Sequence, residues 1–206
     1  MNEHNILGAI LAGGQSKRMG KDKLFLELNN KKLIEYTIDK VKKYLKNVII
    51  ITNQKNEFFL KKNLITVEDC IKGQLGPLVG ILTAMKWAKE NLKGCSWIAT
   101  FPCDTPFFPE TIIQKFIEKS KEKDSLLLCA SSHGRKHNIF GLWSIDLYEK
   151  LHDDLINNKI RKVQDWIEKN KITNVEFNFK EYDPFFNINT LDDLEAAKKI
   201  IKNEKK

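Results

Sequence analysis

Cysteine is scarce in this chain, and no two cysteines lie close together in the sequence. The 206 residues contain four cysteines, without a Cys-x-x-Cys spacing, each in or beside an apolar stretch (Cys70, Cys95, Cys103 and Cys129). Zinc sites and disulfide frameworks need paired or regularly spaced ligands, so this pattern indicates reduced thiols. His133 and His137 are near each other, but they lack cysteine or carboxylate neighbours, which argues against zinc.

A long hydrophobic run is also missing. No apolar segment reaches the roughly 20 residues of a membrane span, and Ile6 to Ala12 lacks the length and charged start of a secretion signal. We therefore expect a cytoplasmic protein without a membrane partner. The length suits one α/β domain, and no repeat or composition break divides it, so we expect residues 1–206 to form a single domain.

Acidic residues are fewer than basic ones. The chain has 27 Asp and Glu against 35 Lys and Arg, which gives a net charge of +8. Such a balance favours anionic partners, although a lysine-rich solvated surface is the simpler explanation. Nucleic-acid binding would add a basic strand with aromatic residues or a basic recognition helix. Neither is present, so we expect no nucleic-acid partner.

Apolar runs bounded by turn residues alternate with segments of helical periodicity. The runs predict strands at Ile6–Leu11, Asn47–Thr52, Leu64–Val67, Trp97–Phe101, Ser125–Ala130, Ile139–Trp143 and Thr173–Phe179. The periodic segments predict helices over residues 33–45, 78–88, 112–117, 146–155, 163–168 and 191–202. This alternation indicates an α/β fold of three layers, Rossmann-like, with a mostly parallel central sheet. Ligands of such sheets bind beyond the carboxyl ends of the strands.

The most informative segment follows the first predicted strand. Residues 11–23 read LAGGQSKRMGKDK, and glycines allow backbone amides to form an anion-binding concavity while Arg18 and Lys23 add positive charge. The spacing fits neither the P-loop nor the dinucleotide-binding fingerprint. On glycine and charge alone, a nucleoside triphosphate site and a solvated basic turn are both open.

The order of residues in this loop, L-A-G-G-x-S-x-R-M-G-x-D-K, resembles the signature loop of nucleotidyltransferases, and among them the molybdenum cofactor guanylyltransferase family. In that family the loop wraps the triphosphate of GTP. The resemblance implies that Arg18 and Lys23 act in catalysis by neutralising the triphosphate. It also implies that the nucleotide is bound by Leu11, Ala12, Gly13, Gly14 and Lys23.

A second motif, Pro102-Cys103-Asp104-Thr105-Pro106, follows the strand Trp97–Phe101. A carboxylate at this place is suited to hold Mg²⁺ against an α-phosphate. The segment matches the family's P-C-D-x-P motif, whose aspartate holds both nucleotide and metal, so Asp104 is our candidate metal ligand and catalytic residue. The alternative is a loop aspartate that caps a helix starting near Pro109.

Three further residues complete the expected nucleotide site. Asn53 and Asp69 end the second and third strands, and the resemblance implies that they read the guanine base. Taken alone, both residues are typical of turns. Residues 76–80, GPLVG, open a predicted helix and resemble the family's G-P-L-x-G segment, which places Gly80 beside the nucleotide.

Segments nearer the carboxyl terminus carry weaker signals. Asn187 and Asn189 match the family's N-x-N-T segment, with Leu191 in place of the usual proline, and their amides suit metal-bound water or phosphate oxygens. Residues 131–138 form a predicted basic loop facing an anionic second substrate, with Asn138 where the family often has proline. Arg161 begins a second basic cluster; contact with the pterin phosphate and simple solvation are both open.

Together, the resemblance implies an enzyme that transfers GMP from GTP to the phosphate of molybdopterin and releases pyrophosphate, with Mg²⁺ as cofactor. The expected partners are GTP, the molybdopterin cofactor and, transiently, other molybdenum cofactor biosynthesis proteins. We expect a monomer. The alternatives are a related transferase that uses CTP or a sugar-phosphate acceptor and, from another class, a nucleic-acid-binding protein.

Overall fold

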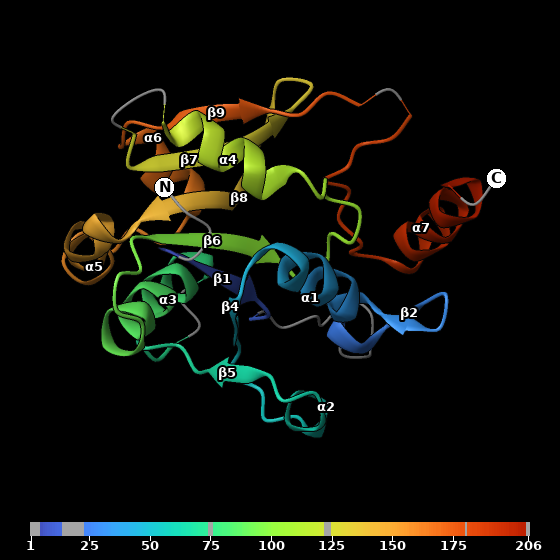
Figure 1. Ribbon diagram of the computed structural model, residues 1–206, viewed down its shortest axis with the longest axis horizontal. Helices are drawn as coiled ribbons and strands as arrows, with labels where there is room; N and C mark the ends of the chain where they lie inside the picture. The colour runs from blue at the N-terminus through green and yellow to red at the C-terminus, as the bar shows by residue number, and fades with distance from the viewer. Residues whose placement is uncertain (1–4, 14–22, 74–75, 122–124, 180, 205–206) are drawn as a thin grey trace.

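A mixed sheet runs through the centre of the molecule. The computed structural model describes residues 5–13, 23–73, 76–121, 125–179 and 181–204. The strands of its main sheet are β1 Ile6–Leu11, β4 Asn47–Ile51, β5 Ile65–Val67, β6 Trp97–Pro102, β7 Leu127–Ser132, β8 Arg135–Ser144 and β9 Thr173–Glu176. Within the described residues, their order is β5-β4-β1-β6-β8-β7-β9 (Figure 1).

The strand directions confirm the predicted, mostly parallel sheet. β4 and β6 flank β1 in parallel, with Ile10 opposite Ile50 on one side and Phe101 on the other. Of the described strands in this sheet, only β8 runs against its neighbours, β6 and β7. Because β4 and β5 lie on one side of β1 and β6 on the other, the order of the strands reverses at β1. Open α/β sheets bind ligands beyond such a switch point.

Helices cover both faces of the sheet. They are α1 Leu33–Tyr44, α2 Glu57–Lys61, α3 Pro77–Asn91, α4 Ile112–Ser120, α5 Tyr148–Ile156, α6 Val163–Glu168 and α7 Leu191–Glu204. Successive side chains of β1 alternate between faces: Ile6 and Ile10 join the core under α1 and α4, whereas Leu7 and Ala9 join the core under α3, α5 and α6. Three layers therefore enclose two buried cores.

A smaller apolar cluster attaches the last helix. The hairpin of β2 (Glu27–Leu28) and β3 (Lys31–Lys32) supplies Leu28, which packs with Leu194 and Ile201 of α7. The N-terminal end of α7 is closed by a reciprocal pair: Asp193 N donates to Thr190 Oγ1 at 3.1 Å, and Thr190 N donates to Asp193 Oδ2 at 2.8 Å. This is the geometry of a capping box, with Thr190 as the residue before the helix.

The prediction of a basic loop at residues 131–138 is wrong. The chain forms a hairpin there, with β7 extending to Ser132 and β8 starting at Arg135. His133 and Gly134 have φ values of 47° and 76°, as a two-residue turn that matches the twist of a hairpin requires. The predicted strand Ile139–Trp143 therefore starts four residues too late, because the charged residues before it hid its beginning.

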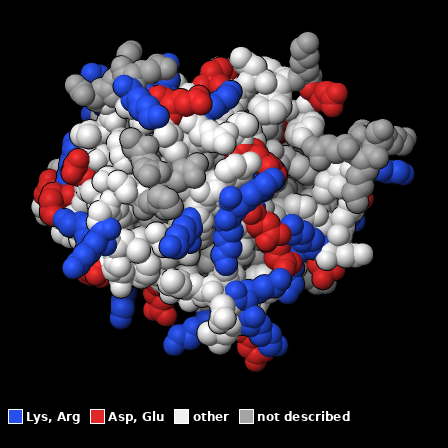
Figure 2. All heavy atoms as spheres, viewed as in Figure 1, with Lys and Arg blue, Asp and Glu red and all other residues white. Residues whose placement is uncertain are grey.

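Surface features accompany this fold. Figure 2 shows lysines and arginines interspersed with aspartates and glutamates over one face. No helix in the described part of the chain is long and apolar enough to cross a membrane.

Each of the four cysteines is a free thiol, as expected. Burial raises the pKa of the Cys129 thiol to about 12, which leaves it protonated and unreactive.

Candidate functional site

A cavity of about 730 Å³ opens at the carboxyl ends of β1, β4 and β6 and at the start of β8. Eight residues singled out from the sequence line it: Leu11, Ala12, Gly13, Asn53, Asp69, Gly80, Asp104 and Asn187. The side chain of Lys23 and the whole of Gly14 and Arg18 lie outside the described residues. The structure thus brings together residues from six separate segments.

The end of β1 forms the floor of the cavity. Leu11 and Ala12 are buried, and Ala12 N donates to Ile51 O of β4 at 2.9 Å, which continues the pairing past the strand. Thr52 N in turn donates to Val67 O at 3.0 Å. The strand ends on this side are therefore held by backbone hydrogen bonds, and the cavity is bordered by fixed main chain.

Gly80 has a packing role at this floor. A Cβ atom at Gly80 would lie 3.2 Å from Leu11 Cδ2 and 3.4 Å from Ile51 Cγ2. Glycine therefore lets α3 approach β1 and β4 closely, just where Pro77 begins the helix. Gly76, before it, has a φ of 83°, a conformation that favours glycine.

Asn53 and Asp69 form one unit on the β4 and β5 side. Asn53 Nδ2 donates to Asp69 Oδ2 at 2.7 Å, and Asp69 N donates to Asn53 Oδ1 at 2.9 Å. The next residue is anchored to α3, since Cys70 N donates to Thr83 Oγ1 at 2.9 Å. An ionised carboxylate offers about four lone-pair positions, so Asp69 keeps acceptor capacity for a ligand after binding Asn53.

Asp104 lies two residues beyond β6 and is tied to the C-terminal segment. Ile188 N donates to Asp104 O at 3.0 Å. The buried Thr105 hydroxyl donates to Asn187 Oδ1 and lies 3.2 Å from Asp104 Oδ1. The alternative helix-capping role for Asp104 is wrong, because α4 starts at Ile112 and its N-cap residue is Thr111.

The oxygen atoms at this point suit a hard cation. Asp104 contributes a carboxylate and Asn187 an amide oxygen beside it, both at the cavity. Within the described ranges, no group of three or more His, Cys, Asp or Glu residues converges as a metal site. Mg²⁺ is commonly held by one or two carboxylates together with water and substrate phosphates, so this sparse set fits Mg²⁺ and does not suit zinc.

The β8 side of the cavity was not predicted in this form. The register between β7 and β8 jumps from Cys129 opposite Gly141 to Ala130 opposite His137, so β8 carries extra residues between these pairs. The three residues between these pairs, Asn138, Ile139 and Phe140, line the cavity together with His137. Bulges turn side chains out of the alternation of a regular strand and are common beside active sites. The polar run directly before an apolar run was the signal available in the sequence.

His137 is held on two sides. Its Nε2 atom lies 2.7 Å from Ser132 Oγ, and its ring stacks on Phe185 with centroids 4.2 Å apart. Burial lowers the pKa of His137; Arg135 adds to this, while Asp183 and Glu176 oppose it. Its imidazole is therefore neutral at pH 7.

The side chain of Arg161 binds the backbone of its own loop. Its Nη1 atom donates to Leu155 O and to Ile160 O, and it does not line the cavity in the described structure. The Arg161 carbonyl lies 3.4 Å from where a Gly76 Cβ would stand. The loop that carries Arg161 thus borders the start of α3 through its backbone, and the expected phosphate contact of its side chain stays a prediction.

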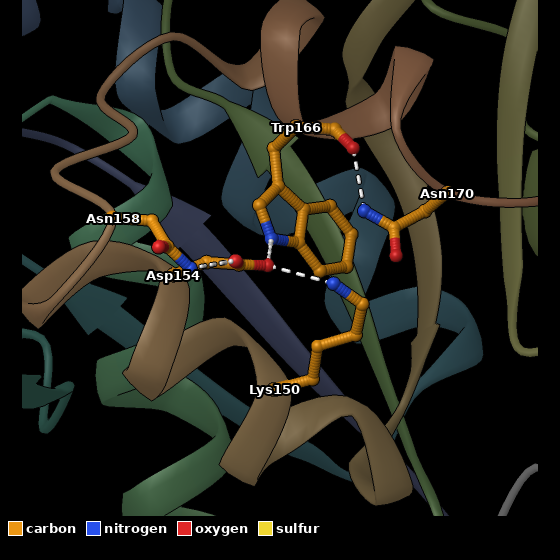
Figure 3. Close-up of polar contacts among 5 residues, drawn as sticks. All are labelled: Lys150, Asp154, Asn158, Trp166 and Asn170. Carbon is orange, nitrogen blue, oxygen red and sulfur yellow. Dashed lines mark hydrogen bonds and ion pairs between the residues drawn. The ribbon is translucent and has the colours of Figure 1, made fainter.

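A buried carboxylate fixes that loop. Asp154 of α5 accepts hydrogen bonds from Lys150 Nζ at 2.8 Å, Asn158 Nδ2 at 2.9 Å and Trp166 Nε1 at 2.9 Å (Figure 3). Asn170 Nδ2 donates to Trp166 O at 2.6 Å. These bonds join α5, the loop after it and α6, which packs Trp166 against Trp143 of β8. A polar network as well as apolar packing therefore holds α5, the loop after it and α6 together.

Known proteins match the chain over most of its length. The family model described as the MobA-like NTP transferase domain matches residues 8–172. A molybdenum cofactor guanylyltransferase from Mesorhizobium japonicum is 34% identical over 97% of both chains.

Solved structures share the fold. The molybdopterin-guanine dinucleotide biosynthesis protein A of Archaeoglobus fulgidus superposes with a TM-score of 0.73 at 22% identity, over 96% of this chain and 99% of that one. A 4-diphosphocytidyl-2C-methyl-D-erythritol synthase from Anaerococcus prevotii superposes with a TM-score of 0.72 at 15% identity, over 98% of this chain and 100% of that one. The fold alone therefore does not determine which nucleotide base a protein of this shape uses. The family-model match and the sequence identity do place this chain: it belongs to the MobA-like nucleotidyltransferases and, among them, to the molybdenum cofactor guanylyltransferase family.

Proposed function

We propose that this protein transfers GMP from GTP to the phosphate of molybdopterin, forming molybdopterin guanine dinucleotide and releasing pyrophosphate. One observation carries the proposal: a single cavity joins the end of β1, the Asn53–Asp69 pair and Asp104. Each element is suited to a different part of GTP, namely the phosphates, the base and the reacting α-phosphate. Family membership supports the same reaction.

Base selection is assigned to Asp69. A carboxylate accepts hydrogen bonds from two neighbouring N–H groups, and guanine presents two such donors on its Watson–Crick edge. The bonds with Asn53 fix where the carboxylate lies before the nucleotide arrives. Adenine and cytosine present a different order of donors and acceptors, so either base leaves a buried polar group unpaired.

The chemistry of transfer needs positioning and charge neutralisation more than covalent participation. Asp104 is assigned to the α-phosphate region, and Thr105 and Asn187 hold that segment in place. Asp104, with the Asn187 amide oxygen nearby, would hold Mg²⁺, and the bound ion would supply positive charge against the phosphates. The acceptor is already an anionic phosphate, so the chain needs no general base.

The test is a pyrophosphate-release assay with GTP, CTP, ATP and UTP, each with and without molybdopterin and with Mg²⁺ varied. Release that needs molybdopterin and favours GTP supports the proposal. A preference for CTP would instead establish the related cytidylyltransferase, and release driven by a sugar phosphate would identify a different acceptor. Asp165→Asn, at an exposed position on α6, is the matched control for carboxylate variants.

A further inference from the structure

The cavity has hydrogen-bond acceptors on two opposite walls. Asp69 follows β5, whereas His137 and Asn138 belong to β8, and β4, β1 and β6 lie between those two strands. From β5 to β8 there are four strand spacings, or about 19 Å. The middle of the cavity holds Gly13 and Asp104. The cavity thus has one wall of acceptors at Asp69, a centre suited to phosphates, and a second wall of acceptors at His137 and Asn138.

The second wall contains a hydroxyl that links a carboxylate to an imidazole. Ser132 Oγ lies 3.2 Å from Asp183 Oδ1 and 2.7 Å from His137 Nε2. A carboxylate only accepts, so the single hydroxyl proton goes to Asp183 and the Ser132 oxygen accepts from Nε2. The ring proton of His137 is therefore on Nε2, and Nδ1 of the neutral ring is an acceptor.

Phe185 makes this arrangement rigid. Its backbone N donates to Asp183 Oδ1 at 2.9 Å, while its ring stacks on His137 at an interplanar angle of 22°. One residue thus orients the carboxylate and restricts the imidazole plane. A fixed orientation of both partners is what a recognition site needs, because less conformational freedom is then lost on binding.

Asn138 provides a second acceptor at the same wall. Its Oδ1 atom is buried and, within the described part of the chain, has no hydrogen-bond partner. An unpaired buried acceptor costs roughly 1–3 kcal/mol. Because Asn138 lines the cavity, a turn of its amide toward the cavity would let a ligand N–H group remove that cost. The bulge places Asn138 beside His137 along the cavity in place of the opposite face that regular alternation would give it.

We propose that Ser132 and Asp183 are positioning residues that keep the proton of His137 on Nε2, so that His137 Nδ1 and Asn138 Oδ1 accept N–H groups from the ring of the second substrate. The inference rests on the proposed function, because a pterin ring carries N–H donors along its edge. It assigns selection of the second substrate to acceptor geometry in addition to the charge of Arg135 and Lys136.

Two substitutions at His137 separate the ring nitrogens. Asparagine places an oxygen near the position of Nδ1, whereas glutamine reaches toward the position of Nε2. We expect His137→Gln to raise the KM for molybdopterin roughly 5–150-fold, the range for an unpaired buried donor, and His137→Asn to keep most of the affinity. The KM for GTP stays unchanged in both. His152→Asn, at an exposed position on α5, is the control. Equal losses in both His137 variants would overturn the assignment of Nδ1.

A double-mutant cycle tests Ser132. Ser132→Ala is expected to raise the KM for molybdopterin in the wild-type background and to have little effect in the His137→Asn background, because its role acts through the imidazole. Equal effects in both backgrounds would show a purely structural role.

The KM for molybdopterin should also rise as pH falls through the lowered pKa of His137, whose charged neighbours are Asp183, Glu176 and Arg135. The KM for GTP should lack that inflection.

Nitrogen-15 NMR of the histidine side chains in the free protein reads the tautomer without any activity. We expect His137 at neutral pH to carry its proton on Nε2, and Asp183→Asn to shift part of the population to Nδ1, since an amide can donate to Ser132. A wild-type proton on Nδ1 would overturn the proposal even if GMP transfer is confirmed. The expected tautomer with no molybdopterin-dependent pyrophosphate release would instead refute the proposed function and, with it, the assigned ligand.

Discussion

The two walls of the cavity are built in different ways. On the β4 and β5 side, the ligand-facing residues follow parallel strands, and their partners lie within 16 positions, as in the bonds between Asn53 and Asp69. On the β8 side, they stand at the beginning of an antiparallel strand, and Asp183, one of the two partners of Ser132, lies 51 positions away. Pairing of β4 with β5 is therefore enough to place Asn53 and Asp69, the nucleotide wall of the proposed function, whereas the second wall also needs the chain after β9.

The largest expected effect comes from a substitution at Asp104, which lies between the two walls of the cavity. Asp104→Asn removes the full charge assigned to the α-phosphate region but leaves both walls intact. We expect turnover to fall roughly 10²–10³-fold, by comparison with the loss of an oxyanion donor, with GTP binding retained because the lost interaction acts mainly in the transition state. Pyrophosphate release and calorimetric GTP titration measure the two quantities. Near-normal turnover at low Mg²⁺ would refute the role of Asp104.

Asp69→Asn tests the nucleotide wall alone. The amide offers one acceptor and one donor where the carboxylate offers acceptors only, so one guanine donor loses its partner. The preference for GTP over ATP should fall by roughly one to two decades, from about 1–3 kcal/mol for an unpaired buried donor. The KM for molybdopterin should stay constant. Glu68→Gln, at the adjacent exposed position, is the control, and full discrimination in Asp69→Asn would reduce Asp69 to a turn residue.

Gly80→Val tests whether the nucleotide wall depends on close packing of α3. The new side chain meets Leu11 and Ile51, and overpacking of this kind costs about 1–3 kcal/mol. Urea unfolding should show that loss. Lys86→Val, on the exposed side of the same helix, controls for the lower helix propensity of valine. A loss no larger than that of the control would contradict the packing role.

The smallest effect is expected away from both walls, at Asp154, whose side chain is 10% exposed. Burial raises its pKa, but hydrogen bonds from Lys150, Asn158 and Trp166 outweigh this and hold it below its usual value. The associated stability is therefore present above the unfolded pKa of about 3.9 and is lost as pH falls through the lower, folded value.

Asp154→Asn should lower the free energy of unfolding at pH 7 by about 1 kcal/mol, a modest figure because Lys150 is half exposed. It should also flatten the decline of stability in acid. Urea titrations at pH 7 and pH 3 measure both, with the exposed neighbour Asp153→Asn as control. If stability declined in acid as steeply in the variant as in the wild type, the hydrogen bonds of Asp154 would contribute nothing to stability.

The sequence predicted the nucleotide wall well because its determinants are short and contiguous. The strand Ile6–Leu11 and the helix over residues 78–88 were found from local pattern, whereas Asn53 and Asp69 became candidates only through the family resemblance; the structure gathers residues from all of them at one cavity. Mg²⁺ binding at Asp104 stays a prediction, as do the roles of Arg18 and Lys23.

The second wall was predicted only in part. The turn at His133 and Gly134 depends on positive φ values at both positions, and the bulge in β8 depends on pairing with β7. Neither follows from the periodicity of one segment. The link from Ser132 to Asp183 was also beyond reach, because it needs the path of the chain after β9. The short helix α2 and the hairpin of β2 and β3 were missed for lack of length.

The reversed direction of β8 has a consequence for how such an enzyme can diversify. Because β8 runs against its neighbours, the turn at His133 and Gly134 lies at the ligand edge of the sheet. Hairpin turns accept insertions with little disturbance of the strands they join. Growth of this one turn would therefore change the β8 side of the cavity while Asn53 and Asp69, on the β4 and β5 side, keep their places.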